Sequence, residues 1–350
     1  MDLNTLARHA GEWLRGTGAD ADIVMSCRIR LARNVPDVPF VARCTPEQKA
    51  ELAAMLSERV LDADIGEGAQ YMSLEGVDQI DRLFLVERHL ISTEHAEADG
   101  ARGVAFDVRE TMSVMVNEED HLRIQAFRSG FHPEETWAAI DALDDRIGER
   151  VQYAFSEQLG HLTACPTNVG TGMRASVMLH LPALGMTRQI EQVVHAVQKM
   201  GLAVRGLYGE GTQASGGLYQ VSNQMTLGKS ELEIIGNIAS TVPTIITMER
   251  KAREALMAQS REQLEDKIWR SYGLLRSVRV ISSGETIDHL SHLRLGVNLG
   301  LVDRLDMGTI NQLFILTLPA HLQKIEGREL EPRQRDIVRA NFIRETLGEA

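Results

Sequence analysis

The sequence predicts an α+β fold, in which an antiparallel sheet flanked by helices is followed by an all-helical domain. Segments in which apolar and polar residues alternate recur between residues 22 and 205, with helical patterns between them. The short acidic turn at residues 117–120 joins two of these segments directly, which favours antiparallel pairing. From about Met248 onward only helical patterns remain. One face of the sheet is expected to be covered by helices and the other to be open and polar.

The first predicted strand begins at Asp22 and alternates strictly. It places Ile23, Met25, Cys27, Ile29 and Leu31 on one face and Val24, Ser26, Arg28 and Arg30 on the other. Residues 103–108, 112–116 and 121–127 predict a meander of three further strands, and residues 174–181 and 202–205 predict two more. On several strands an apolar face is opposed by a face that carries arginine: Arg28, Arg30, Arg123, Arg174 and Arg205.

Helical patterns cover residues 45–61, 133–147 and 187–200. Ser230 with Glu233, and Ser282 with Glu285, form capping boxes ahead of two later helices, and Pro332 suits the first turn of a last helix. We therefore expect an N-terminal extension at residues 1–21, a catalytic domain at 22–245 and a helical C-terminal domain at 246–350.

Composition excludes several classes of protein. A chain of 350 residues with 43% hydrophobic side chains is neither disordered nor a bare linker. The 37 Lys and Arg against 49 Asp and Glu give a net charge of −12, which argues against nucleic-acid binding. The three cysteines, Cys27, Cys44 and Cys165, match neither a disulfide framework nor a metal knuckle. With no signal peptide or membrane span apparent, we expect a cytoplasmic protein.

Two familiar nucleotide-binding motifs fail their context tests. The segment from Gly170 to Ala175 fits the pattern GxGxxA. A dinucleotide fold needs a strand before this segment and a helix after it. Pro166 argues against the preceding strand, and the residues after Met173 predict a strand instead of a helix. The segment from Gly228 to Ser230 imitates the end of a P-loop, yet Asn223 stands where its first glycine belongs. Any anion site must therefore be built differently.

The strand arginines have two readings. They could decorate a solvated sheet face with scattered ion pairs. Alternatively, guanidinium groups bind phosphate oxygens bidentately and keep their charge near neutral pH, so several that converge make a cradle for a nucleoside triphosphate.

Four segments resemble the motifs of the phosphagen (guanidino) kinase family, in the order of that family: residues 22–33 (DIVMSCRIRLAR), 117–123 (NEEDHLR), 165–177 (CPTNVGTGMRASV) and 205–210 (RGLYGE). Within the family the chain is most similar to the bacterial protein-arginine kinases. Only about 20 residues precede the first strand, where creatine and arginine kinases carry a helical domain, and residues 335–340 (RDIVRA) are a second mark of that branch. The implied fold is the guanidino-kinase catalytic domain, which is glutamine-synthetase-like.

The resemblance implies an ATP site, with Mg²⁺ bridging phosphate oxygens and no metal ligand from the protein. It maps onto Ser26, Cys27, Arg28, Ile29, Arg30, His89, Arg123, Arg174, Ala175, Ser176, Val177, Met178, Arg205, Gly206, Leu207, Tyr208, Gly209 and Glu210. From the residues alone, His89 also fits a packed or surface histidine, and the alternation places Cys27 in the core. Tyr208 stands where small-molecule arginine kinases carry arginine, so one phosphate contact is absent or supplied elsewhere.

The acceptor end needs carboxylates, because a guanidinium must lose a proton before nitrogen attacks phosphorus. Within the motifs, Glu119 is the candidate that orients and deprotonates it, with Glu210 as its partner. Without the motif, Glu119 would be part of a solvated acidic turn. Cys165 corresponds to the family's reactive cysteine, whose thiolate nearby arginines would favour, and a buried inert thiol is the alternative.

The resemblance thus implies an ATP-dependent kinase that phosphorylates arginine residues of proteins. It further implies a stress-response role, delivery of marked proteins to a Clp-type protease, a zinc-binding activator, a transcriptional repressor as substrate, and a homodimer. A small-molecule guanidino kinase and a decayed phosphoarginine-binding adaptor are the alternatives. In the last helix, Arg335, Asp336, Arg339 and Ala340 correspond to an allosteric phosphoarginine site, and the spacing of the first three predicts one exposed flank.

Overall fold

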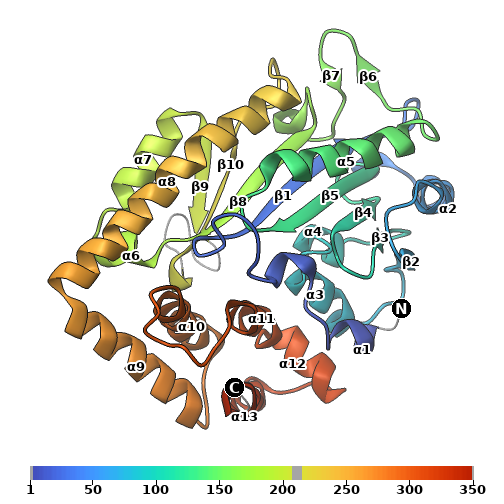
Figure 1. Cartoon of the computed structure of the whole chain (residues 1–350). Helices are drawn as coiled ribbons and strands as arrows, with labels where there is room; N and C mark the ends of the chain where they lie inside the picture. The colour runs from blue at the N-terminus through green and yellow to red at the C-terminus, as the bar shows by residue number, and fades with distance from the viewer. Residues whose placement is uncertain (1–2, 207–214, 349–350) are drawn as a thin grey trace.

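The computed structural model describes residues 3–206 and 215–348 and contains an eight-stranded sheet, shown in Figure 1. The strands run in the order β2-β3-β4-β5-β1-β8-β10-β9, and every pairing within this sheet is antiparallel. Its strands are β1 Val24–Arg33, β2 Gln70–Ser73, β3 Gly103–Phe106, β4 Met112–Val116, β5 Leu122–Ser129, β8 Met173–His180, β9 Leu202–Gly206 and β10 Leu218–Asn223. A separate small hairpin pairs β6 Phe155–Ser156 with β7 Gly160–His161.

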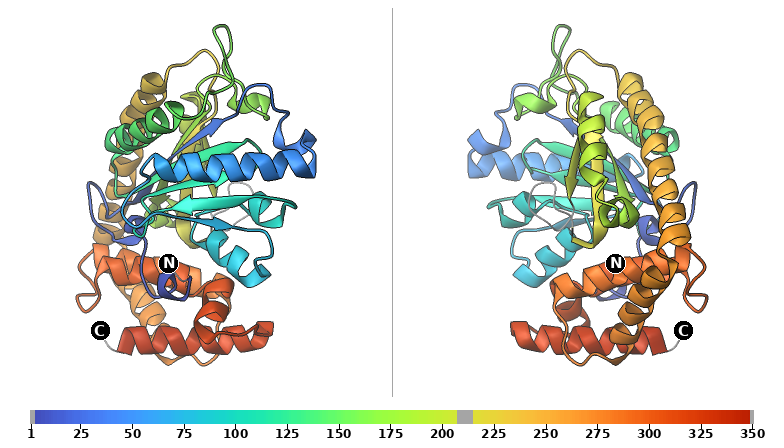
Figure 2. Two further views of the ribbon diagram at one scale, coloured as in Figure 1. Left: turned by 90° about the vertical axis from the view of Figure 1, so that its right-hand side faces the viewer. Right: turned by 90° about the vertical axis from the view of Figure 1, so that its left-hand side faces the viewer.

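One face of the sheet is covered by helices, as Figures 1 and 2 show. These are α2 Pro46–Asp62, α5 Pro133–Gly148, α7 Ile190–Lys199 and α8 Glu231–Gln259. Apolar residues spaced four apart, such as Leu52, Leu56 and Val60 of α2, point inward and build the main core against alternate strand residues. Thr45 begins α2 with a complete capping box.

The opposite face is only partly covered. At the β2–β4 side, α1 Leu3–Leu6, α3 Gln79–Glu87 and α4 Thr93–Glu97 pack on residues such as Val104 and Met115. Short turns of 3-10 helix lie at Glu12–Leu14, Val41–Arg43, Pro166–Asn168 and Ser215–Gly217, and α6 Pro182–Met186 follows β8. The expected open polar face is therefore confined to β5, β1, β8, β10 and β9, from the middle of the sheet to its β9 edge.

The C-terminal part is helical, and Figure 2 shows these helices gathered at one end of the sheet. Its helices are α9 Arg261–Ser277, α10 Ser283–Asn298, α11 Met307–Leu316, α12 Pro319–Glu326 and α13 Pro332–Gly348. Helices α9, α10, α11 and α13 share a core that also takes in Met25 and Leu218 of the sheet, whereas Ala320 of α12 packs in the core formed with α1, α3 and α4. Helix α8 passes through residue 245 without a break and leads into α9 (Figure 1). The guanidinium of Arg294 donates to the carbonyls of Ala21 and Asp22, which fixes α10 to the start of β1.

The expected strands and helices are confirmed, with shifts of a few residues. The strand expected at 103–108 ends at Phe106, because the Asp107 carboxylate accepts hydrogen bonds from the turn at Arg109, Thr111 and Met112. The full capping box at Ser230 is present, and Ser282 accepts from the Glu285 N–H as a helix N-cap.

One prediction of alternation is wrong. The pairing register of β1 with β8 shifts between Val24 and Ser26, so the strict alternation is broken at Val24 and Met25. Met25 packs against the C-terminal helices, while Val24 joins the main core.

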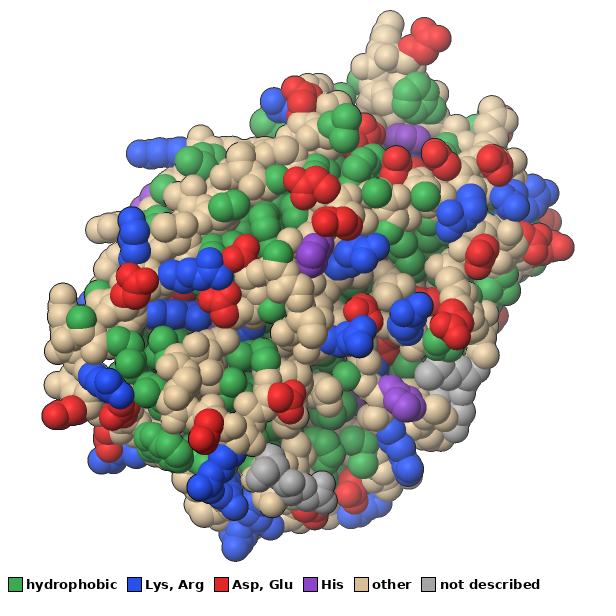
Figure 3. Space-filling model, in the orientation of Figure 1, with side chains coloured by type: hydrophobic (Ala, Val, Ile, Leu, Met, Phe, Trp, Pro, Cys, Tyr) green, Lys and Arg blue, Asp and Glu red, His purple; other side chains and the backbone are tan. Residues whose placement is uncertain are grey.

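Charges of both signs are intermixed on the face seen in Figure 3, with no broad basic surface there. Within the described ranges, no helix has the length and apolar character needed to cross a membrane.

Candidate active site

All five predicted arginines lie on the open face, because each occupies an outward-facing position of its strand. Arg28 and Arg30 lie two residues apart on the central strand β1, and Arg30 lies directly opposite Arg174 on β8. Arg123 projects from β5 beside them, at the register of Ala32. Arg205 at the end of β9 completes the group from the sheet edge.

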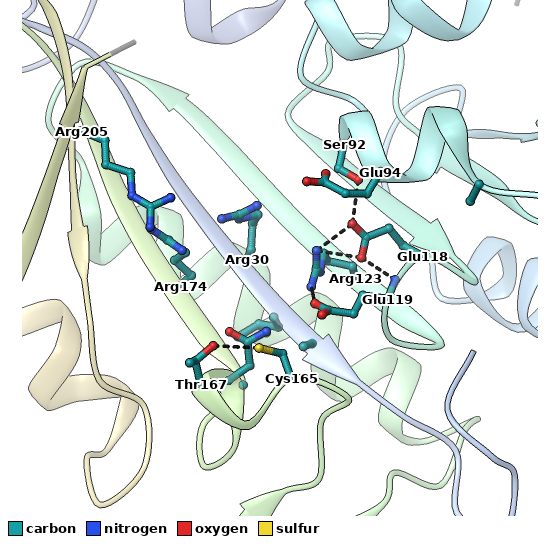
Figure 4. Close-up of a pocket in the computed structure, with 15 residues that line it drawn as sticks. Arg30, Ser92, Glu94, Glu118, Glu119, Arg123, Cys165, Thr167, Arg174 and Arg205 are labelled. Carbon is teal, nitrogen blue, oxygen red and sulfur yellow. Dashed lines mark hydrogen bonds and ion pairs between the residues drawn. The ribbon is translucent and has the colours of Figure 1, made fainter. Parts of the chain in front are cut away.

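A pocket of about 610 Å³ opens above these arginines, and Figure 4 shows its lining. Arg30, Arg174 and Arg205 form one wall, and Arg123 with Glu118 and Glu119 forms the facing wall. Cys165 and Thr167 close a third side, and Ser92, Glu94 and Asn168 also line the pocket.

The arginines of the first wall, and Arg28 beside them on β1, form no ion pair with any described residue. Among the described residues, the side chains of Arg28 and Arg30 have no ion pair, and Nε of Arg30 and of Arg174 is buried without a hydrogen-bond partner. Burial, followed by repulsion from Arg174 and Arg123, lowers the pKa of Arg28 to about 10. Burial and the same kind of repulsion lower the pKa of Arg30 and Arg174. Arginines that are held close together despite burial and mutual repulsion are typical of an anion site.

Arg123 is the exception in the group, because it is neutralised by the acidic turn. Burial acts to lower its pKa, but Glu118, Asp120 and Glu119 together raise it. Its guanidinium pairs with Glu118 at 2.7 Å and with Glu119 at 2.8 Å. Asn117 starts this turn in a left-handed conformation, with φ of 60°, which asparagine tolerates well.

The two glutamates of the turn have different surroundings. The side chain of Glu118 is 2% exposed and also accepts a hydrogen bond from the Ser92 hydroxyl at 2.6 Å. The side chain of Glu119 is 46% exposed and faces the pocket. Glu119 is thus available to an incoming group, while Glu118 holds Arg123 in place. Sequence reasoning singled out Glu119 and missed the supporting role of Glu118, whose only signal was its place in the motif.

Asp120 positions the cysteine loop against this turn. Its carboxylate accepts hydrogen bonds from the Asn34 side chain and from the Ala164 N–H, both at 2.7 Å. The next residue, Cys165, is half-buried at the pocket wall, and its Sγ lies 3.0 Å from the Thr167 hydroxyl oxygen.

The glycines of the rejected dinucleotide motif have a structural explanation. Gly172 has φ of +64°, and a Cβ there would lie 2.6 Å from the Ala32 carbonyl oxygen of β1. Only glycine allows the loop to approach the central strand so closely.

Further along β1 lies a second pocket of about 190 Å³, lined by Trp13, Ser26, Arg28, His89, Phe127, Ser176, Met178 and Gln220. Burial, followed by repulsion from Arg28 and Arg30, lowers the pKa of His89 to about 3, so its ring is neutral at physiological pH.

Several predicted positions direct their side chains elsewhere. Those of Cys27, Ile29, Ala175 and Val177 lie in the main core, on the other face of the sheet. Burial raises the pKa of the Cys27 thiol to about 12. Gly206 ends β9, whereas Leu207, Tyr208, Gly209 and Glu210 lie outside the described residues.

The residues of the predicted phosphoarginine site in the last helix do not form the exposed flank that their spacing predicts. Arg335 and Asp336 are half-buried, but Arg339 is 1% exposed and Ala340 lies in the C-terminal core. The Arg339 guanidinium turns inward because it donates to the carbonyls of Thr317 and Ile281, both at 2.8 Å, and to Asp336. The predicted pair of Asp336 with Arg339 is present, at 2.5 Å.

Comparison with known families agrees with this arrangement. Residues 52–252 match the catalytic domain of ATP:guanido phosphotransferases, and residues 261–350 match the C-terminal domain of the protein-arginine kinase McsB. A protein-arginine kinase of Halothermothrix orenii is 45% identical over 99% of this chain and 100% of its own, and one of Bacillus subtilis is 45% identical over 96% and 93%.

Solved structures agree as well. The duplicated taurocyamine kinase of Schistosoma mansoni has a TM-score of 0.59 at 30% identity, covering 67% of this chain and 34% of its own. A lombricine kinase has a TM-score of 0.58 at 26% identity, covering 70% and 69%. Taken with the pocket of strand arginines that faces Glu119 and Cys165, these matches show that the chain belongs to the protein-arginine kinases, a family of the ATP:guanido phosphotransferases.

Proposed function

We propose that the protein transfers the γ-phosphoryl group of ATP to the guanidinium group of arginine residues in proteins. The observation that carries this proposal is a pocket in which arginines that form no ion pair with the described residues face the exposed carboxylate of Glu119. The arginine wall suits the triphosphate, and the carboxylate suits a cationic acceptor. The names of the relatives, protein-arginine kinases over nearly the whole chain, support the same choice of acceptor.

The chemistry assigned to the chain is alignment followed by removal of one proton. Glu119 accepts a hydrogen bond from the acceptor guanidinium and takes its proton as nitrogen bonds to the γ-phosphorus. The bond from phosphorus to the bridging oxygen breaks, and ADP leaves. Arg28, Arg30, Arg174 and Arg205 compensate the charge on the phosphate oxygens, in positions set before substrate arrives.

Mg²⁺ belongs to the proposal as a partner of the nucleotide. Among the described residues, no group of three His, Cys, Asp or Glu side chains is arranged to hold a metal ion. Phosphate oxygens and water are ligands that Mg²⁺ prefers, so the arginine wall fits a cation that arrives with ATP. When bound, the cation neutralises charge on the β- and γ-phosphate oxygens.

Cys165 and Glu210 complete the acceptor site in this proposal. The half-buried thiol of Cys165 lines the same pocket as Glu119, where a thiolate would contact the guanidinium. Glu210 is proposed from its motif as the second carboxylate, and it lies outside the described residues.

The remaining parts of the proposal rest on family resemblance. We assign Arg335, Asp336, Arg339 and Ala340 to a phosphoarginine-sensing site in the C-terminal domain, and we retain domain limits at residues 21 and 245. Because Arg339 is committed to backbone carbonyls, ligand binding there must begin at Arg335 and Asp336. A homodimer, a cytoplasmic stress-response role, a Clp-type protease, a zinc-binding activator and a repressor substrate complete this proposal.

Two acceptors presented separately test the function. We expect ADP release when ATP is supplied with a casein-like protein and not when it is supplied with free L-arginine. Release with free arginine alone would instead support the small-molecule guanidino kinase. Binding of phosphoarginine without any ADP release would support the decayed adaptor.

A further inference from the structure

We propose that four exposed apolar side chains, Phe155, Leu159, Met225 and Leu227, form a docking surface for apolar residues of the acceptor protein that lie close to its target arginine. The proposal rests on the protein-kinase function above and deepens it by naming the kind of acceptor segment that is recognised. Phe155 and Leu159 belong to the β6–β7 hairpin, and Met225 and Leu227 belong to the loop between β10 and α8. We call these four residues the apolar patch.

The side chains of the apolar patch are unusually exposed for their type. The exposed fraction is 60% for Phe155, 47% for Leu159, 61% for Met225 and 49% for Leu227. Among the described residues, eight large apolar side chains are at least 47% exposed, and half of these belong to the patch. Single exposed apolar residues need no explanation, but several that gather in one region are typical of an interaction site.

The hairpin half of the patch is attached to the cysteine loop, which we define as residues 165–170. The His161 N–H of β7 donates to the Gly170 carbonyl at 2.8 Å, so the hairpin pairs with the end of this loop. The ring of Phe155 meets the ring of His161 edge-on, with centroids 5.3 Å apart. Phe155 is therefore held beside the cysteine loop while most of its ring stays open to solvent.

The other half of the patch lies against the same loop. The hydroxyl of Thr226 is turned inward and donates to the Thr167 carbonyl at 2.9 Å. Thr226 is buried while its neighbours Met225 and Leu227 are exposed, an alternation that is typical of extended chain. The backbone approaches closely here, since a Cβ at Gly170 would lie 2.6 Å from the Thr226 carbonyl oxygen. Figure 1 shows the hairpin and the start of α8 at the same end of the sheet.

The patch adjoins the pocket that receives the acceptor. Thr167 and Asn168 line that pocket, and Thr167 is seen at its edge in Figure 4. The same two residues line a groove of about 180 Å³, whose other residues include Gln224 and Thr226, on either side of Met225. The surface therefore continues from the acceptor pocket, past the cysteine loop, to the apolar patch.

A protein acceptor must place its chain on the surface around the pocket. An arginine within a protein has backbone on both sides, so its neighbours lie at the rim when its guanidinium reaches Glu119. Each residue of an extended chain spans about 3.3 Å, so a few residues cover a distance of about 10 Å or more. Folded proteins keep most large apolar side chains in their cores, whereas an unfolded segment presents them together with its arginines. The patch therefore favours unfolded acceptor segments with apolar residues near the arginine.

The first test locates the bound acceptor on the parent protein. A series of peptides carries one arginine and one benzoylphenylalanine, an apolar photoreactive residue, at successive positions on either side of the arginine. After irradiation and digestion, we expect mass spectrometry to find crosslinks within residues 155–159 or 225–227. Crosslinks confined to other surfaces would overturn the proposal.

The second test compares two acceptor peptides that differ only in the residues near the arginine, which are leucine in one and serine in the other. The variants are Met225→Gln with Leu227→Gln, and Phe155→Gln. The control is Trp269→Gln, which changes an equally exposed apolar residue of α9 outside the patch. We expect the patch variants to raise KM for the leucine peptide about three- to tenfold and KM for the serine peptide much less. An equal rise for both peptides, or the same selective rise in the control, would overturn the proposal.

A measurement of molecular mass in solution separates this proposal from its main alternative, a second copy of the chain seated on the patch. In that case the patch variants lower the mass of the assembled parent and leave both KM values unchanged, which overturns the proposal. Failure of the proposed function is a different result, namely a parent that phosphorylates neither peptide. A parent that phosphorylates both peptides with equal KM contradicts only the role of the patch.

Discussion

Replacing Glu119 with glutamine separates proton removal from nucleotide binding. The substitution keeps the size of the side chain and removes the carboxylate that accepts the proton. We expect kcat for phosphorylation of a protein acceptor to fall about 10²- to 10⁴-fold, the usual contribution of a general base. This fall corresponds to about 3 to 5 kcal/mol of barrier.

Nucleotide affinity and stability should change little in Glu119→Gln. Glu119 pairs with Arg123 at 2.8 Å, and Arg123 keeps its partners Glu118 and Asp120 in the variant. Because the Glu119 side chain is 46% exposed, loss of that pair should cost less than about 1 kcal/mol of unfolding free energy. Calorimetric titration with ATP and urea unfolding would check these two expectations.

The matched control is Glu94→Gln, since Glu94 is an exposed carboxylate that lines the same pocket. It should affect KM for the cationic acceptor more than kcat. An equal fall of kcat in both variants would mean that pocket charge, rather than proton transfer at Glu119, carries the rate. Turnover at the parent rate in Glu119→Gln would remove this residue from the mechanism.

Three further predictions use the electrostatics of the same region. Arg174→Met should bind ATP about tenfold or more weakly, as measured by calorimetry. It should unfold at no lower urea concentration than the parent, because the substitution removes a buried cation that is repelled by Arg205. A loss of stability would refute the idea that Arg174 carries an unpaired charge. Cys165→Ser should slow transfer, and an acceptor peptide should protect the parent from a thiol alkylator; full activity after alkylation at Cys165 would make the thiol inert. Burial lowers the pKa of His95 from 6.5 to about 4, so between these values the unfolded chain binds a proton that the folded chain does not, and stability falls as pH falls. His95→Gln should therefore lose less unfolding free energy than the parent between about pH 7 and pH 5 in urea titrations, and equal losses would contradict the assignment.

The strands and their arginine face could be predicted because period-2 alternation determines which side chains share a face. Arg28, Arg30 and Arg174 project together as the pattern indicated, and the acidic turn lies beside them with Glu119 in the same pocket. These are consequences of local sequence, repeated on neighbouring strands.

Other features depend on contacts between distant segments, which alternation does not describe. The register shift near Met25 comes from pairing with β8 and from the C-terminal core. Arg339 turns inward because two backbone carbonyls from other elements, at Thr317 and Ile281, accept from it. Trp13 gains its position from residues 127, 315 and 318, and its only signal in the sequence is a tryptophan in a short segment without periodicity.

The central claim is that phosphate is transferred from ATP to a guanidinium nitrogen of a protein. The most direct test is mass spectrometry of an acceptor protein after incubation with the enzyme and ATP, before and after brief mild acid treatment. We expect a phosphoryl group located on arginine that is lost in acid, since a P–N bond is acid-labile. An acid-stable phosphoryl group on serine, threonine or tyrosine, or no phosphoryl group on the protein, would contradict the account.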